Sequence, residues 1–220
     1  KSSLGGMFRS SFAETVFIQK YKHDGCETWE SLCSVLVEDV CRDKMPPDEK
    51  EQLIEYMREG KFLAGGRYLY YAGREKKFFN NCYLLRSEED TREDWAELSK
   101  KAELCLSSGG GIGNDYSIYR SSGSPLRGTG GIASGPLSKM IMVNEQGRGI
   151  MQGGSRRSAI YASLNWKHGD VLDFVHMKDW AHMPVAGTDK TLFDLKQADF
   201  NFPCPMDMTN ISVNYDTDWL

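Results

Sequence analysis

The sequence predicts an α/β fold in which a helical N-terminal region precedes short strands that alternate with helices. Apolar side chains recur at helical spacing through residues 29–41 and 92–107, which indicates amphipathic helices. Short apolar runs at 78–85 and 160–166 have the length and the aromatic content of buried strands. Strands that alternate with helices pair mainly in parallel, so functional residues are expected in the loops at strand ends.

The first 60 residues are predicted to be mainly helical. The segment that starts at Thr28 is "TWESLCSVLVEDVCR", and the next, "PPDEKEQLIEYMREGK", begins with prolines, continues with acids and ends near Gly60. After Gly60 the sequence changes to the aromatic, glycine-punctuated "FLAGGRYLYYAGR". We therefore expect a boundary near residues 61–78, with a helical region over 1–75 and a second region over 76–220.

The second region is predicted to alternate strands and helices. "FFNNCYLL" is expected to form a buried strand, and the next helix has Asp90 or Thr91 as its N-cap. "YSIYR", residues 116–120, is expected to form a strand, and a further helix begins near residues 134–136. The remaining elements are the strand "IYASLNW", the helix "HGDVLDFVHMKDW" and the strand "TNISV". The last strand runs into the first turn of another element, so the fold looks interrupted there.

Composition excludes several classes of protein. The chain has 220 residues, of which 40% are hydrophobic, enough for a packed core. A net charge of −4 and a pI near 5.6 argue against broad binding to nucleic acid or membranes. No run approaches the roughly 18 apolar residues that span a bilayer, and the opening segment does not read as a signal peptide, so a cytoplasmic protein is expected. The cysteines and histidines lack metal-ligand spacing, so no metal site is expected.

Glycine-rich loops are the main functional signal. "SSGGGIG" follows a helix and leads into a strand, which is the reverse of the strand, glycine and helix order of dinucleotide-binding and Walker loops. A helix end needs only one glycine, so three suit the floor of a ligand pocket. "SPLRGTGGIASGP" places Arg127 ahead of a helix N-terminus, and "QGGSRRSA" joins two glycines to Arg156 and Arg157. Both loops suit phosphate, although the second alone is equally compatible with an exposed basic loop.

Some of the candidate residues also have a purely structural interpretation. Cys82, Cys105 and Cys204 could each pack in the core, as free cysteines usually do. Asp90, like the acids that follow it, could simply favour the first turn of a helix, where the dipole stabilises negative charge. The individual residues leave these alternatives open.

Taken in order, the motifs resemble one family. "NNCYLL", "SSGGGIG", "SPLRGTGGIASGPLSKM", "MQGGSRRSA", "HGDVLDFVHMK" and "TNISV" resemble the catalytic (large) subunit of ribonucleotide reductase, most of all its adenosylcobalamin-dependent class II. "FIQKYKHDGCETWESL" and "GRYLYYAG" extend the resemblance over nearly the whole chain. The resemblance implies a ten-stranded α/β barrel, of which this chain would hold a helical leader and the first half. It also implies adenosylcobalamin as the cofactor of the complete enzyme.

The resemblance further implies roles for individual residues. Cys82 would be the first of two cysteines that reduce the ribose of a ribonucleotide, and a thioredoxin- or glutaredoxin-like dithiol would reduce the resulting disulfide. The substrate would lie near Asn81, Ser107, Ser108, Gly109, Gly110, Gly111 and Arg156. A deoxynucleoside triphosphate effector would contact or act through Asp90, Arg127, Gly130, Gly131, Gln152, Gly153, Gly154 and Arg157. Glu89 fits the role of Asp90 nearly as well.

The sequence also departs from the family pattern. It lacks the Asn-x-Cys-x-Glu motif that supplies the radical cysteine and a glutamate, and Cys204 in "NFPCPMD" has the wrong spacing and order to replace it. The second redox cysteine, the reductant-reactive tail and a cobalamin platform are missing too. We therefore expect activity to need a second polypeptide that carries the radical half, with this chain being either naturally split or truncated. The alternatives are a non-catalytic deoxynucleotide-binding regulator and an unrelated oxidoreductase, which the motif order disfavours.

Overall fold

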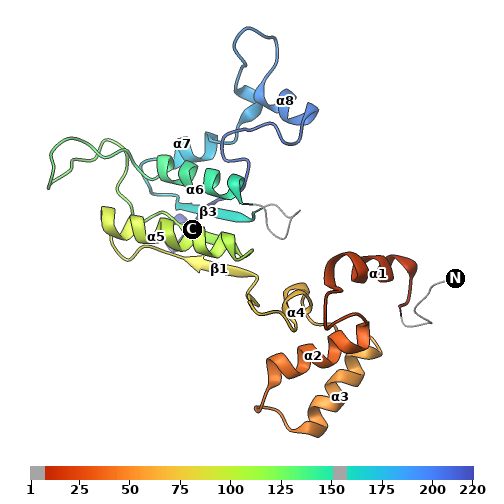
Figure 1. The fold of residues 1–220 in the computed structure, drawn as a ribbon. Helices are drawn as coiled ribbons and strands as arrows, with labels where there is room; N and C mark the ends of the chain where they lie inside the picture. The colour runs from red at the N-terminus through yellow and green to blue at the C-terminus, as the bar shows by residue number, and fades with distance from the viewer. Residues whose placement is uncertain (1–7, 151–157) are drawn as a thin grey trace. The chain divides into compact units, whose positions relative to one another are not determined.

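The computed structural model describes residues 8–150 and 158–220 (Figure 1). The chain divides into two compact units, Lys1–Asn80 and Asn81–Leu220. No helix within the described residues is both long enough and apolar enough to cross a membrane. The first unit is helical, and the second contains the sheet.

The N-terminal unit is a set of helices around a small apolar core. Its elements are α1 (Ser11–Val16), a π-helical turn η1 (Phe17–Tyr21), α2 (Trp29–Cys41), α3 (Pro47–Arg58) and α4 (Gly66–Tyr71). Thr28 and Ser31 form a reciprocal capping box at the start of α2, and Pro47 occupies the first turn of α3. The apolar stripe that predicted α2 is buried against the rest of this unit through Leu32, Leu36 and Val37.

The C-terminal unit contains a parallel four-stranded sheet in the order β1-β2-β3-β4. The strands are β1 (Cys82–Leu85), β2 (Gly111–Asp115), β3 (Ile160–Asn165) and β4 (Thr209–Asn214). The helices are α5 (Arg92–Ser107), α6 (Leu137–Gly149), α7 (Val171–His176) and α8 (Leu192–Ala198), with 3-10 turns η2 (Trp180–His182) and η3 (Thr217–Trp219). Each crossover carries a helix, as parallel pairing requires. The predicted α/β class with parallel strands is confirmed.

Helices cover one face of this sheet and leave the other face open within the described residues (Figure 1). Strand side chains such as Ile112 and Ile160 pack against α5, α6 and α7 in one apolar core. Side chains alternate along a strand, so their neighbours point to the opposite face. There Leu84 is 86% exposed and Tyr161 is 39% exposed. Cys82 lies on this open face as well.

One predicted strand was wrong. "YSIYR", residues 116–120, forms a turn, and the strand lies earlier, at Gly111–Asp115. The rings of Tyr116 and Tyr119 are buried against Trp95, with centroid separations of 6.2 and 5.6 Å. The aromatic residues that suggested a strand therefore pack onto α5 instead of pairing in the sheet. The actual strand, β2, was not predicted because its glycines lack the side chains that are typical of strands.

Candidate functional site

Cys82 and the predicted glycine floor lie side by side at the start of β1 and β2. Cys82 is the ladder partner of Gly111, and the amide of Gly111 donates a 2.8 Å hydrogen bond to the carbonyl oxygen of Asn81. A Cβ atom placed on Gly111 would be 3.5 Å from the Cys82 Sγ and 3.2 Å from the carbonyl oxygen of Ala159. Glycine at position 111 thus leaves the backbone bare directly beside the thiol.

The Cys82 side chain is exposed, although the strand that carries it was expected to be buried. The reason is that Cys82 starts an edge strand and points to the open face of the sheet. Among the six cysteines, all of which lie within the described residues, Cys82 is the only exposed one. Burial raises the pKa of the Cys105 and Cys204 thiols, which favours their unreactive protonated form. Cys82 is therefore the most accessible of the six cysteines.

The residues from Ser107 to Gly110 form the C-terminal end of α5 and its cap. Ser107 is the last helical residue, and the hydroxyl of Ser108 donates a 2.7 Å hydrogen bond to the Cys105 carbonyl oxygen. Gly109 has φ +84°, a left-handed conformation that favours glycine at a helix end. The Gly110 amide donates a 3.0 Å hydrogen bond to the same carbonyl oxygen of Cys105. Consecutive glycines thus serve different purposes, and Gly111 is the one that adjoins the Cys82 thiol.

We expect Gly110→Ala to destabilise the C-terminal unit by about 1 to 3 kcal/mol, the usual cost of overpacking. The added Cβ would overlap the ring of Tyr83, which packs against the core and cannot move away freely. Gly113→Ala is the matched control in β2, because its Cβ would make an ordinary contact of 3.5 Å with Tyr161. Urea unfolding of both variants checks this, and equal stabilities would contradict it.

A second candidate site is a cavity of about 380 Å³ beside Asp90, which we call the Asp90 pocket. It lies where the loops that follow β1 and β2 meet the first turns of α5 and α6, at the carboxyl ends of these strands. Ligands of open parallel sheets commonly bind at this edge. Its charged lining residues are Asp90, Arg92, Arg120, Arg127 and Lys139.

The Asp90 pocket carries excess positive charge. The carboxylate of Asp90 accepts hydrogen bonds from Nε of Arg120 at 2.5 Å and from the Arg120 amide at 3.2 Å, so this pair is neutral overall. The side chains of Arg92, Arg127 and Lys139 also line the cavity, and they form no ion pair with any carboxylate of the described residues. Thr91, whose hydroxyl caps α5, also lines the cavity, so the positive end of the helix dipole adjoins it. This arrangement suits a polyanionic ligand.

The structure brings together several residues that the sequence selected. Asp90 and Arg127 line the same cavity, whereas Glu89 does not, which favours Asp90 over that alternative. Gly130 and Gly131 do not line the cavity but form the turn of the same loop, with φ of +70° and +83°. The other predicted loop residues, Gln152, Gly153, Gly154, Arg156 and Arg157, lie outside the described residues.

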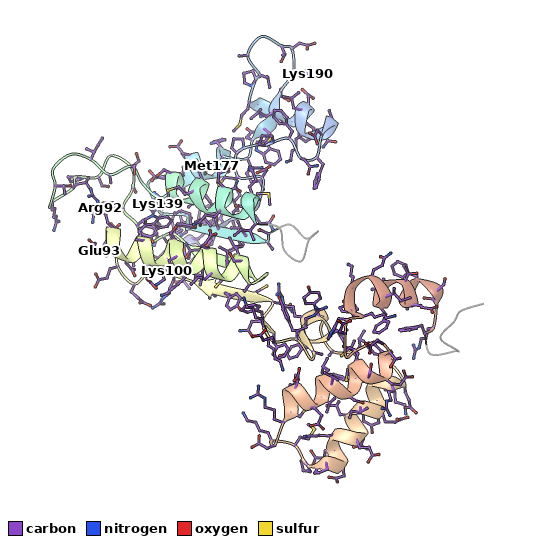
Figure 2. The ribbon with its side chains drawn as sticks, in the orientation of Figure 1. Arg92, Glu93, Lys100, Lys139, Met177 and Lys190 are labelled. Carbon is purple, nitrogen blue, oxygen red and sulfur yellow. The ribbon has the colours of Figure 1, made fainter. Side chains whose placement is uncertain are left out.

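Sequence reasoning missed three cations of the pocket. Arg92 and Arg120 lie outside the glycine-rich motifs, and Lys139 was not selected although it lies at the end of "SPLRGTGGIASGPLSKM". One signal was present: Lys139 lies in the first turn of α6, where the helix dipole disfavours a positive charge. Figure 2 shows Arg92 and Lys139 at the same end of the α5 and α6 layer.

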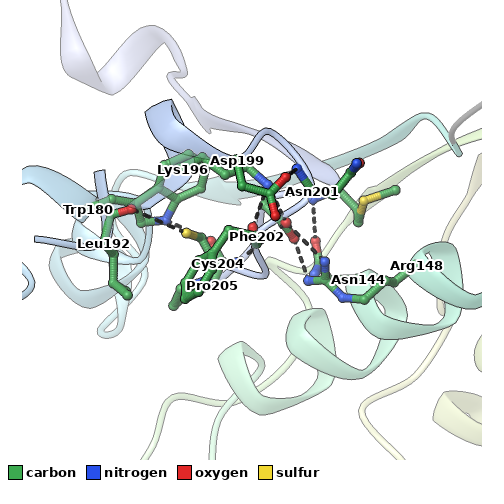
Figure 3. Close-up of polar contacts among 12 residues, drawn as sticks. Asn144, Arg148, Trp180, Leu192, Lys196, Asp199, Asn201, Phe202, Cys204 and Pro205 are labelled. Atoms are coloured by element: carbon green, nitrogen blue, oxygen red, sulfur yellow. Dashed lines mark hydrogen bonds and ion pairs between the residues drawn. The ribbon is translucent and has the colours of Figure 1, made fainter. Parts of the chain in front are cut away.

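A buried ion cluster fixes the other end of α6 (Figure 3). The guanidinium of Arg148 donates to both carboxylate oxygens of Asp207, at 3.0 and 2.5 Å. The Lys196 ammonium lies 2.9 Å from the same carboxylate, whose side chain is only 1% exposed. Asn144, one turn earlier, accepts hydrogen bonds from the Met208 amide and the Thr209 hydroxyl. The last turn of α6, which leads into the predicted loop 152–157, is thereby held against the start of β4.

The chain is similar to known reductases. Residues 80–188 match the family model described as "Ribonucleotide reductase, barrel domain". A vitamin B12-dependent ribonucleoside-diphosphate reductase of Mycobacterium tuberculosis is 33% identical over 128 residues, 58% of this chain and 18% of that protein. The Thermoplasma acidophilum protein of the same name is 34% identical over 125 residues, 57% of this chain and 16% of that protein. The ribonucleoside-diphosphate reductase large subunit of vaccinia virus is 30% identical over 132 residues, 60% of this chain and 17% of that protein. The matches thus span less than a fifth of each relative.

Proposed function

Residues 80–188 belong to the ribonucleotide reductase barrel-domain family, and from this premise we propose that the chain carries the first redox cysteine and the effector site of such an enzyme. The observation that carries the proposal is the position of Cys82, an exposed thiol beside the bare backbone of Gly111. The radical cysteine and the partner thiol are assigned to the remainder of the enzyme, since the matched segment spans less than a fifth of each relative.

The chemistry assigned to Cys82 is a two-electron reduction of the ribose of a ribonucleotide. The bond between C2′ and its hydroxyl breaks and a C2′–H bond forms. Cys82 and a second thiol supply two electrons and two protons, so that water and a disulfide are the other products. A thioredoxin- or glutaredoxin-like dithiol then restores the two thiols by exchange. Gly111 contributes by letting the sugar approach the thiol without meeting a side chain.

Adenosylcobalamin is the cofactor proposed for the complete enzyme, since two of the similar proteins are named vitamin B12-dependent. The described residues do not fit it. The Asp90 pocket is lined with cations and has the volume of a small-molecule site, and the sheet face around Cys82 and Tyr161 is open. Radical generation is therefore assigned to the rest of the enzyme.

The Asp90 pocket is proposed to bind the deoxynucleoside triphosphate effector. A triphosphate matches the three cations that form no ion pair among the described residues and the adjoining helix N-terminus, and 380 Å³ lies in the range of small-molecule pockets. Asp90 would lie near the nucleoside and Arg127 near the phosphates. The segment Gln152–Arg157 would transmit the identity of the effector to the substrate, with Arg156 nearest the substrate. Such coupling must act equally in both directions on binding.

Calorimetric titration of the full chain with dATP, dTTP and dGTP tests the effector site. We expect at least one of them to bind, and Arg127→Ala to weaken that binding about tenfold, or roughly 1.4 kcal/mol, by removing a charged phosphate contact. Arg86→Ala is the matched control, because Arg86 is exposed, pairs with Glu88 and does not line the pocket. If none of the nucleotides binds, even with the partner polypeptide present, the proposal of an effector site is refuted.

A non-catalytic regulator that binds deoxynucleotides remains the second candidate function. Such a regulator would need only the Asp90 pocket to bind its nucleotide, and a thiol at position 82 would not contribute to its function. The exposed Cys82 beside Gly111 is the feature that favours the reductase.

A further inference from the structure

Lys139 is held in an environment that does not favour its charge. It lies in the first turn of α6, where the dipole opposes a cation, and burial lowers the pKa of its ammonium. Its Nζ lies 4.6 Å from the centroid of the Trp95 ring. This cation–π contact offsets only part of the cost of burying the ammonium. Within residues 8–150 and 158–220 no carboxylate is close enough to form an ion pair with it. A bound anion would offset this cost.

The groups that surround Lys139 leave that position open to a ligand. Asp90, in the loop before α5, favours the charged ammonium, but Arg120 already occupies its carboxylate. Arg92, on α5, opposes the charge of Lys139. Tyr119 lines the same cavity, and burial raises the pKa of its phenol. Arg92 and Arg127 are exposed, whereas Lys139 is half-buried in the cavity wall.

We propose that Lys139 binds a phosphate group of the nucleotide in the Asp90 pocket and makes nucleotide affinity depend on pH in the alkaline range. This inference rests on the proposed function, because it takes a deoxynucleoside triphosphate as the ligand. The triphosphate is the charged part of that ligand, and Lys139 is more buried than Arg92 and Arg127, the other two cations of the pocket that form no ion pair among the described residues. A phosphate contact is therefore stronger here than at the exposed arginines, since fewer waters screen it.

The sign of the pH effect follows from linkage. A bound phosphate favours the protonated ammonium, so binding is constant well below the pKa of Lys139. Above that pKa each binding event must take up a proton, and affinity falls, by up to about tenfold per pH unit. Arginine keeps its charge throughout this range and stacks well on an aromatic ring such as Trp95. Lys139→Arg should therefore remove the alkaline loss.

The test is calorimetric titration of the full chain with dATP between pH 7.5 and about pH 10, and with inorganic triphosphate at pH 7.5 only. The terminal phosphate of dATP titrates well below this range, as phosphate monoesters do near pH 6, whereas inorganic triphosphate has a second terminal phosphate that still releases a proton at alkaline pH. We expect the affinity of the native protein to fall toward high pH and that of Lys139→Arg to stay level. Lys139→Met should bind about tenfold more weakly at pH 7.5 and show no alkaline loss.

Lys100→Met is the matched control, since Lys100 lies on α5, is exposed and pairs with Glu97 (Figure 2). Thermal unfolding of each variant verifies that it is folded before titration. Parallel pH profiles for the native protein and Lys139→Arg, or unchanged binding by Lys139→Met, would overturn the role of Lys139 while leaving the nucleotide site in place. No binding of either probe by the native protein would overturn both.

Discussion

Replacing Asp207 by alanine is expected to lower the free energy of unfolding by about 3 to 5 kcal/mol, the cost of removing one partner from a buried ion cluster. The side chain of Asp207 is 1% exposed and pairs with both Arg148 and Lys196, while Glu145 pairs with Arg148 as well. Its loss leaves the half-buried Lys196 with no carboxylate partner among the described residues, next to Arg148, which keeps Glu145 as its counter-charge. Urea unfolding measures the effect.

Asp218→Ala is the control for this variant. Asp218 also pairs with a lysine, Lys167, but its side chain is 69% exposed, so its removal should cost less than about 1 kcal/mol. Comparable losses in the two variants would show that the cluster around Asp207 contributes no more than a surface ion pair.

The same carboxylate should make stability depend on pH. Burial alone would raise its pKa, but hydrogen bonds from Arg148 and Lys196 outweigh that effect and hold the pKa of Asp207 well below its ordinary value. Its stabilising contribution is therefore complete above the unfolded pKa of about 3.9 and is lost as the pH falls below it. The native protein should lose stability more steeply than Asp207→Asn between about pH 4 and pH 2.

Cys82→Ser is expected to lower multiple-turnover reduction in the assembled enzyme by about a thousandfold or more, which corresponds to roughly 4 kcal/mol. A hydroxyl can neither supply the electrons nor form the disulfide that the reaction requires. The measurement is deoxynucleotide formation with a dithiol donor. Cys41→Ser, a change of the same kind in the N-terminal unit, should retain activity. Retained turnover in Cys82→Ser would refute the assigned role.

Much of the fold was predictable because local signals agree with the packing. Apolar spacing located α5, and the short apolar runs located β1 and β3. The strand β2 was not predictable in this way, because Gly111 and Gly113 remove the side chains by which a strand is recognised. Glycine fits there because Tyr161 and the Cys82 thiol occupy the adjacent space.

The residues of the candidate sites were also predictable only in part. The glycine-rich loop selected Arg127, whereas Asp90 was selected only through the family resemblance, with Glu89 as a near equivalent. Arg120 was missed because it meets Asp90 from 30 residues away, through a turn whose position was itself mispredicted. The cluster of Arg148, Lys196 and Asp207 was missed for the same reason, since no periodic pattern connects three separated charges. Polar side chains that are far apart in the sequence but meet in the fold cannot be identified from local sequence patterns.

The most direct measurement is the oxidation state of the sulfur at position 82 after one catalytic cycle. The native protein, assembled with the polypeptide that completes its barrel, would be given one equivalent of ribonucleotide and no external reductant. Mass spectrometry after alkylation should then find this sulfur in a disulfide, in proportion to the deoxynucleotide formed. Product formation with the sulfur still free and alkylated would contradict the account.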